Sequence, residues 1–181
     1  MQSMKLKSNS KTVSLILILL VFFGIGMAIP QRFSMPVQGA KRRSYNQESF
    51  WYYPWGKSVT HKGVDIFEKI GTPILSSTAG LVLYSGEFGI GGCVVVVLGP
   101  KWRLHYYAHL KESNCHALQF LSRGEMLGKL GDSGNAKGKP PHLHYSIFSL
   151  IPHIGLIDNS MQGWKKMFIL NPIPELNKVC K

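Results

Sequence analysis

Two short segments contain histidine and aspartate at spacings that suit a divalent metal ion. His61 and Asp65 lie four residues apart in HKGVD, and His142 and His144 lie two apart in PPHLHY. A catalytic Zn²⁺ commonly takes three protein ligands from His and Asp or Glu and leaves one position for water. His61, Asp65 and one histidine of the second segment would complete such a set.

The spacing within each segment limits which side chains can share one ion. In a straight strand, residues four apart face the same side but lie roughly 13 Å apart, too far for one metal. Gly63, between His61 and Asp65, permits a bend that would bring the two side chains together. His142 and His144 would face one side of a strand at roughly 7 Å. One could bind the metal while the other accepts a proton from water near pH 7.

Short strands separated by turns should position these residues. Alternating or β-branched runs predict strands at 64–67, 74–75, 81–84, 93–98, 102–109 and 142–147. Glycines recur too densely for long helices, so helix should be minor, a turn or so near 115–123 and beyond 160. The pattern predicts a mainly β fold, an antiparallel sandwich or barrel-like domain.

A third segment, YAHL at 107–110, lies between the other two and contains His109. Together with HKGVD at 61–65 and GDSGNAKGKPPHLHY at 131–145, it resembles the lysostaphin-type, or LytM-like, zinc endopeptidases of bacterial cell walls. The resemblance covers roughly residues 50–175, and the order and approximate spacing of the segments also match. It implies an antiparallel two-sheet, barrel-sandwich-like peptidase domain with a groove over one sheet.

The resemblance also implies a role for each residue of these motifs. His61, Asp65 and His144 would bind one Zn²⁺ per chain, His142 would be the general base, and His109 would orient water or stabilise the oxyanion. The expected reaction is hydrolysis of peptide cross-links in peptidoglycan. Because His109 and His142 are both present, we favour an enzyme over the alternative, a non-hydrolytic LytM-like module that binds wall or activates another wall hydrolase.

Two points stay open in this comparison. Some family members have a tyrosine shortly before the first ligand, whereas Trp55 is the sixth residue before His61. We expect the aromatic cluster Trp51, Tyr52, Tyr53 and Trp55 to be core rather than groove. The residues do not encode which bond is cut. The Pro-Pro pair at 140–141 resembles members from double-membraned bacteria and favours D-Ala to diamino acid cross-links over glycine bridges.

The first thirty residues have the pattern of an export signal. Lys5, Lys7 and Lys11 precede an uncharged apolar run over residues 13–29. That run is at the lower limit for a membrane-spanning helix and exceeds a typical signal-peptide core. We expect residues 1–30 to be an uncleaved membrane anchor, with a cleaved signal peptide as the near alternative. The catalytic domain would lie outside the cytoplasm on the periplasmic side of the envelope, or be secreted if the signal is cleaved.

Composition suggests the remaining boundaries and partners. Residues 31–49 are polar, basic and aperiodic, which is typical of a linker or loosely attached arm. Residues 50–175 should form the zinc metallopeptidase domain and 176–181 a C-terminal tail. The formal charge is +12, of which the three lysines before residue 13 contribute three, and such a surface favours polyanions. No basic helix, RNA-binding strand signature or zinc-finger spacing indicates nucleic acid. The expected partners are peptidoglycan peptides and the membrane, and the oligomeric state stays open.

The overall composition excludes several other classes of protein. With 45% apolar and 17% charged residues, the chain can build a core and is not disordered. Three cysteines exclude a disulfide-dense mini-protein. Outside the cytoplasm, Cys115 and Cys180 could form one disulfide, while Cys93 lies in an apolar run and should be a buried small hydrophobe. We expect three other histidines to be structural or surface residues: His105, His116 and His153.

Overall fold

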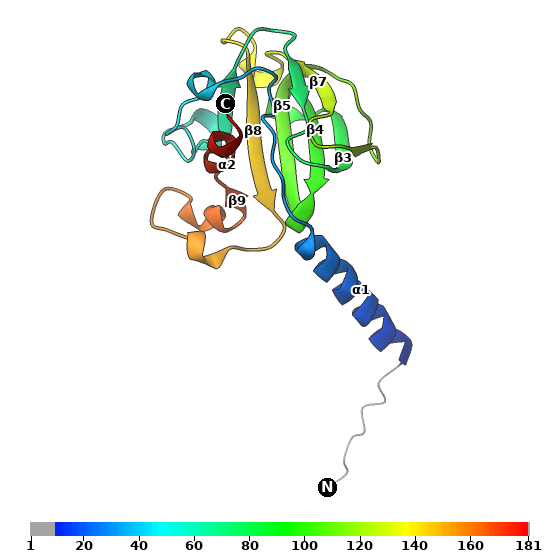
Figure 1. Ribbon diagram of the computed structural model, residues 1–181. Helices are drawn as coiled ribbons and strands as arrows, with labels where there is room; N and C mark the ends of the chain where they lie inside the picture. Colours follow the sequence, from blue (N-terminus) through cyan, green and yellow to red (C-terminus); the bar gives the residue numbers. More distant parts are fainter. Residues whose placement is uncertain (1–9, 181) are drawn as a thin grey trace.

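The computed structural model describes residues 10–180 (Figure 1). Nine strands and two α-helices are found in this part of the chain, joined by short 3-10 turns. The helices are α1 (Ser10–Ala28) and α2 (Ile173–Val179). The strands are β1 (Val64–Phe67), β2 (Pro73–Leu75), β3 (Gly80–Glu87), β4 (Cys93–Gly99), β5 (Arg103–Ser113), β6 (Phe120–Leu121), β7 (Met126–Leu130), β8 (His142–Ser149) and β9 (Ile169–Leu170). The expected mainly β, antiparallel class is confirmed.

All nine strands are joined into one branched antiparallel sheet. The main order is β1-β8-β5-β4-β3-β6, β9 pairs with β8, and β2 pairs with β7. The first part of β5 pairs with β4 and β8, and its last part pairs with β7 beyond an irregularity between Leu110 and Glu112. The long strand β5 therefore connects β7 and its partner β2 to the main row of strands. The hydrogen bonding is continuous, and the strands form one sheet where two sheets were expected.

The six strands expected from the sequence are all present, with ends that differ by a few residues. Three further strands, β6, β7 and β9, are only two to five residues long and give no extended alternating pattern. The stretch at 115–123 contains a turn and β6 instead of the expected helical turn. Beyond residue 160 the α-helix is α2, which has Pro174 in its first turn, where proline is tolerated.

The core is built from the central strands, which are covered on both faces. Most side chains of β4 and β8 are buried instead of every second one. Val95, Tyr107, Leu110, Tyr145 and Ile147 are almost completely shielded from water. Such burial explains why the β-branched run of β4 shows no alternation with polar residues.

The segment at 31–49 is not a loosely attached arm. Phe33, Val37 and Tyr45 are buried members of the core cluster. Val37 also forms an antiparallel bridge with Ile74 of β2. These apolar residues are spaced irregularly because each fits a separate place on the sheet, so no period reveals them in the sequence. The folded unit therefore includes residues before the expected limit at 50.

The C-terminal end is also part of the folded unit. α2 places Leu176 in the core, although a tail was expected from residue 176. The expected disulfide is absent, because Cys115 and Cys180 are both free, as is the buried Cys93. The Sγ of Cys115 lies 3.6 Å from the carbonyl oxygen of Leu127 in β7, whereas Cys180 directly follows α2.

The N-terminal helix α1 stands apart from this core. Figure 1 shows it projecting away from the sheet. Residues 11–28 are long and apolar enough to cross a membrane, and none of them is buried against the protein. The helix is apolar all round, which is typical of a segment surrounded by lipid. α1 is thus a candidate membrane span by length and composition.

Candidate metal centre and active site

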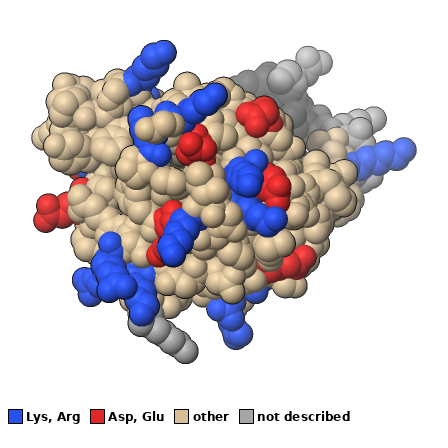
Figure 2. Space-filling model, turned by 90° about the horizontal axis from the view of Figure 1, so that it is seen from above, with Lys and Arg blue, Asp and Glu red and all other residues tan. Residues whose placement is uncertain are grey.

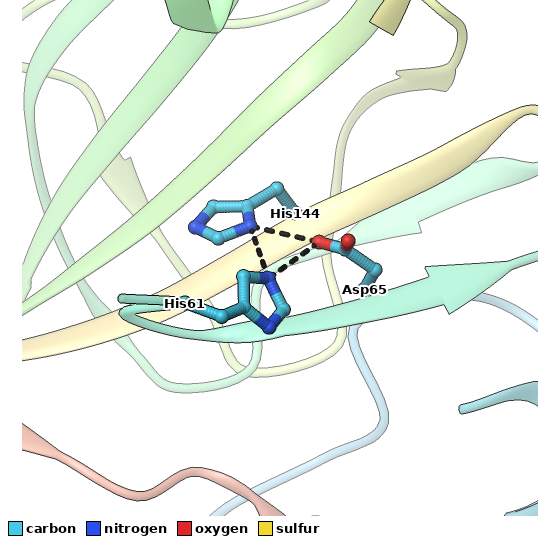
Figure 3. Close-up of side chains that lie close together, drawn as sticks. All are labelled: His61, Asp65 and His144. Atoms are coloured by element: carbon cyan, nitrogen blue, oxygen red, sulfur yellow. Dashed lines mark hydrogen bonds and ion pairs between the residues drawn. The ribbon is translucent and has the colours of Figure 1, made fainter. Parts of the chain in front are cut away.

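The pairing of β1 with β8 brings two of the expected ligands together. Asp65 lies directly opposite His144 in the antiparallel register. His61 lies in the turn that leads into β1, and its ring reaches the same point. Figure 3 shows the side chains of His61, Asp65 and His144 directed toward one another. His61 and Asp65 are buried, and His144 is half-buried.

The facing atoms of these three side chains are spaced as ligands of one ion. His61 Nε2 lies 3.0 Å from Asp65 Oδ1, His144 Nδ1 lies 2.8 Å from the same oxygen, and the two nitrogens are 3.2 Å apart. In a tetrahedral zinc site with bonds of about 2.0–2.1 Å, donor atoms are about 3.3 Å apart. A small outward movement of these side chains would therefore accommodate Zn²⁺.

The outer nitrogen of each ring determines what the inner nitrogen can do. His61 Nδ1 lies 2.9 Å from the carbonyl oxygen of Ser49, which can only accept, so Nδ1 carries the hydrogen. The hydroxyl of Ser146 donates to the carbonyl of Lys62 at 2.8 Å and so accepts from His144 Nε2 at 3.0 Å. In the neutral rings, His61 Nε2 and His144 Nδ1 therefore each carry a lone pair and no hydrogen.

Three lone-pair atoms thus face one another with no hydrogen between them. Burial raises the pKa of Asp65, but when the rings of His144 and His61 are protonated, their hydrogen bonds and charge lower it more, so the carboxyl pKa then lies well below its usual range. An ionised carboxylate beside two imidazole lone pairs is stabilised by positive charge at their common point, from a metal ion or from a proton on one ring. Two nitrogens and one oxygen are a donor set that Zn²⁺ accepts, and the residues present fit that metal.

Gly63 is required by space more than by backbone conformation. A Cβ atom there would lie 2.5 Å from the carbonyl oxygen of Tyr145, 2.5 Å from the Ser146 hydroxyl and 2.9 Å from His144 Nε2. The turn between His61 and Asp65 thus passes directly over β8. The backbone bends at Gly63, as expected, and this close approach allows residues four apart to share one point.

His109 and His142 lie beside the three clustered side chains. Their ring centroids are 5.0 Å apart, and His142 Nε2 is 3.9 Å from Asp65 Oδ2. His142 Nδ1 donates to the carbonyl of Pro140 at 2.8 Å, and His109 Nδ1 donates to the carbonyl of Ser133 at 3.0 Å. In the neutral rings, both Nε2 atoms are left as acceptors. Burial lowers the pKa of His109 to about 4, so it is neutral near pH 7.

The backbone at His109 is held in an uncommon conformation. Its φ is +66°, which costs a non-glycine residue on the order of 1 kcal/mol and is maintained only where the surroundings enforce it. The loop at 131–139 holds it in place. The carbonyl of Ser133 accepts a hydrogen bond from the His109 ring, and the hydroxyl of Ser133 accepts one from the backbone N–H of Cys93 at 2.9 Å. This glycine-rich loop is therefore tightly turned and packed.

A groove of about 500 Å³ is lined by four of these five side chains, Asp65, His109, His142 and His144, and the buried His61 is not part of its lining. Trp55 lines it and stacks on the ring of His61 with centroids 4.2 Å apart. Of the aromatic cluster expected to be core, only Trp51 is buried, and Tyr52 and Tyr53 are exposed. Further lining residues are Lys57, Ser58, Phe67, Asn135, Lys139 and Pro140.

Three contacts at this site were not anticipated from the sequence. Ser49 and Ser146 bind the outer nitrogens of the two histidines, and Trp55 covers one ring. Only Ser146 left a signal, because it lies two residues after His144 and so on the same face of one strand. The histidines expected elsewhere lie outside the groove: His105 is fully buried, His116 is exposed, and His153 contacts Ser149.

Charged side chains are dispersed over the end of the molecule remote from α1. Figure 2 views this end and shows Lys and Arg interspersed with Asp and Glu across uncharged surface. The positive net charge is therefore not gathered into one continuous basic patch on this face.

An antiparallel sheet with a His-Asp-His cluster, two further histidines and a groove is suited to metal-assisted hydrolysis. Comparison with known families agrees with this geometry, because residues 59–153 match peptidase family M23. The matched region is more than half of the chain and contains all five side chains. The chain belongs to this family of peptidases.

Individual relatives support the same assignment. The L-Ala--D-Glu endopeptidase of Bacillus subtilis is 29% identical over 80% of this chain and 42% of its own length. The peptidoglycan DD-endopeptidase ShyA of Vibrio cholerae is 33% identical over 62% of this chain and 26% of its own length. The lysostaphin catalytic domain of Staphylococcus simulans superposes with a TM-score of 0.56 at 25% identity, covering 71% of this chain and 89% of that one. The chain spans less than half the length of these curated relatives.

Proposed function

We propose that this chain is a zinc-dependent endopeptidase that hydrolyses peptide cross-links of peptidoglycan. One observation carries the proposal: His61, Asp65 and His144 direct three lone-pair atoms at one point, with two acceptor imidazoles beside it. A structural cluster of buried histidines would instead bind one another through hydrogens. The relatives named for endopeptidase activity support the reaction class.

Each side chain then has a defined task. His61 Nε2, the Asp65 carboxylate and His144 Nδ1 would hold one Zn²⁺, which when bound would act as a Lewis acid toward the scissile carbonyl and lower the pKa of water. His142 Nε2 accepts the proton of the attacking water and returns it to the leaving amine. His109, neutral and with only Nε2 free, accepts a hydrogen bond and orients that water rather than donating to an oxyanion.

The groove favours a substrate that carries carboxylates. Lys57 and Lys139 both line it and are exposed. Within the described residues, no carboxylate lies within ion-pair distance of either lysine. Unpaired cations attract the acidic groups of stem peptides, which glycine bridges lack. We therefore favour D-Ala to diamino acid cross-links as the substrate.

The place of action is the cell envelope. α1 would anchor the chain in the membrane with the peptidase domain outside the cytoplasm, on the periplasmic side. Its length and exposed apolar surface support this arrangement. If the segment is cleaved as a signal peptide, the domain is released instead.

The decisive experiment compares the full chain with His142→Ala, both purified in detergent and analysed for zinc. We expect one zinc per chain in both proteins. We expect release of muropeptides from directly cross-linked sacculi to fall by 10²–10⁴-fold in the variant, the usual contribution of a general base. His116→Ala, which removes an exposed imidazole outside the groove, should cleave like the parent.

The opposite results have clear meanings. One zinc per chain without cleavage by the parent would reject the hydrolase and favour the non-hydrolytic module. Faster cleavage of glycine-bridged sacculi than of directly cross-linked ones would reject the proposed substrate while leaving the enzyme in place.

A further inference from the structure

The groove and the helix α1 lie at opposite ends of the sheet. In the pairing of β5 with β8, His144 lies opposite Ala108, whereas Ser149 lies opposite Arg103 at the other end. Five residues of strand separate these levels, which is roughly 17 Å. Figure 1 shows α1 leaving the molecule near the C-terminal end of β8, where this strand ends at Ser149.

The helix is attached to that end by packing as well as by the chain. The indole of Trp102, just before β5, donates to the carbonyl of Phe23 at 3.0 Å, and its ring lies 5.1 Å from the ring of Phe22. A Cβ atom on Gly26 would come within 2.5 Å of the same indole, so the helix backbone lies directly against it. After the helix, Gln31 donates to the buried His105 at 3.0 Å. No free hinge separates α1 from the sheet.

A loop beside this attachment exposes an unusual number of apolar side chains. It follows β8, and we call residues 150–157 the apolar loop. Leu150, Ile154, Leu156 and Ile157 are all exposed, Ile154 to 72%. The amide of Leu150 donates to the carbonyl of Trp102 at 3.0 Å, which places the loop next to the base of α1.

Aromatic and basic side chains follow this loop. Trp164 is 57% exposed, and the ammonium group of Lys165 lies 5.5 Å from its ring centre. Exposed apolar residues with tryptophan and lysine nearby are the composition of surfaces that lie in the interface of a bilayer. Exposure of such apolar surface to water is unfavourable.

We propose that the apolar loop and Trp164 insert into the headgroup and acyl boundary of the membrane that α1 crosses. Continuity with α1 identifies the occupant, because a helix surrounded by lipid brings the bilayer surface to this end of the sheet. Lys165 would contact anionic phospholipid headgroups. The domain then stands on the membrane in one orientation, with the groove directed away at a fixed height of roughly 17 Å above the loop. The inference rests on α1 as a membrane span, and it does not require hydrolysis.

The test uses the full chain in vesicles of phosphatidylcholine and phosphatidylglycerol with bromine on the upper acyl carbons, which quenches nearby tryptophan. Of the four tryptophans, Trp102 and Trp164 lie at the α1 end. Bromine should quench both of them in the parent. The amount of emission that bromine removes should therefore be lower by roughly half in Trp164→Phe. Trp55→Phe, at the groove, should leave the quenched emission unchanged. Equal quenched emission in parent and Trp164→Phe would overturn the proposal.

A second pair of variants tests the loop without removing a tryptophan. Ile154→Asp should reduce quenching of Trp164, because a charge at the interface opposes insertion. Ile90→Asp alters an exposed isoleucine near the groove and should have no effect. Unchanged quenching in Ile154→Asp would contradict the proposal. Release of the parent chain from vesicles by alkaline washing would overturn this inference and the anchor, but not the hydrolase.

Discussion

The imidazole rings of the site are oriented by the nitrogens that face away from it. Three of the four rings donate to backbone carbonyls, and His144 donates to a serine hydroxyl. The acceptors are Ser49, Pro140, Ser133 and Ser146. Since each outer nitrogen carries the hydrogen, each inner nitrogen is an acceptor. The acceptor character of the site thus depends on contacts made by the opposite side of each ring.

Ser146→Ala tests this dependence at one residue. Without the hydroxyl, the tautomer and orientation of His144 are no longer fixed. We expect metal affinity to fall 10–100-fold, the usual effect of losing such a partner. Competition with a chelator on the full chain measures it. Ser85→Ala removes a hydroxyl that binds Ser113 on another part of the sheet and should bind metal like the parent. Equal affinity in both variants would show that Ser146 does not position the ligand.

At the scale of the secondary-structure elements, the pairing of β1 with β8 depends on Gly63, which passes directly over the neighbouring strand. Gly63→Ala would place a methyl group against the backbone of Tyr145, which cannot move without disturbing the register. We expect the free energy of unfolding to fall by about 1–3 kcal/mol. Denaturant unfolding of the full chain in detergent measures the change. A Cβ atom on Gly155 would have no neighbour within 4 Å, so Gly155→Ala should change the free energy of unfolding by less than about 0.5 kcal/mol. Equal stability of the two variants would mean that the turn tolerates a side chain.

At the scale of the whole molecule, a buried polar cluster connects the N-terminal segment with the central strands. His105 Nδ1 lies 2.7 Å from the Tyr145 hydroxyl, which lies 2.6 Å from the hydroxyl of Ser77. Gln31 donates to the other nitrogen of His105. Burial, with a smaller contribution from the charge of Arg103, lowers the pKa of His105 to about 3. The folded protein therefore keeps this imidazole neutral.

Stability should consequently fall in acid. An ordinary histidine pKa is 6.5. Below that pH, His105 of the unfolded chain binds a proton, whereas folded His105 does not bind one until about pH 3. The contribution of His105 is present above pH 6.5 and decreases by about 1.4 kcal/mol for each pH unit below it. Between pH 7 and 4, the free energy of unfolding of His105→Gln should therefore fall by about 3 kcal/mol less than that of the parent. His116→Gln, at an exposed site, should follow the parent. Identical pH profiles for parent and His105→Gln would disprove the assignment.

Much of the site could be predicted because its motifs are local in sequence. HKGVD and HLHY each contain two of the clustered residues within five positions, and strand spacing limits where their side chains point. The strands at 64–67, 93–98 and 142–147 were predictable for the same reason, since β-branched and apolar runs act on the backbone where they occur. Strands of two residues, such as β6 and β9, depend on a neighbour and leave no such signal.

The sequence by itself determined the donor set, the mainly β class and an apolar N-terminal helix, because side-chain chemistry and short-range periodicity are properties of adjacent residues. Tertiary structure alone decided that residues 31–49 belong to the core, that Ser49 orients His61, and that Trp55 covers it. It also kept Cys115 and Cys180 apart. These features depend on which surfaces meet after the chain has folded, and residues that meet, such as Tyr45 and Asn177, lie up to 132 positions apart.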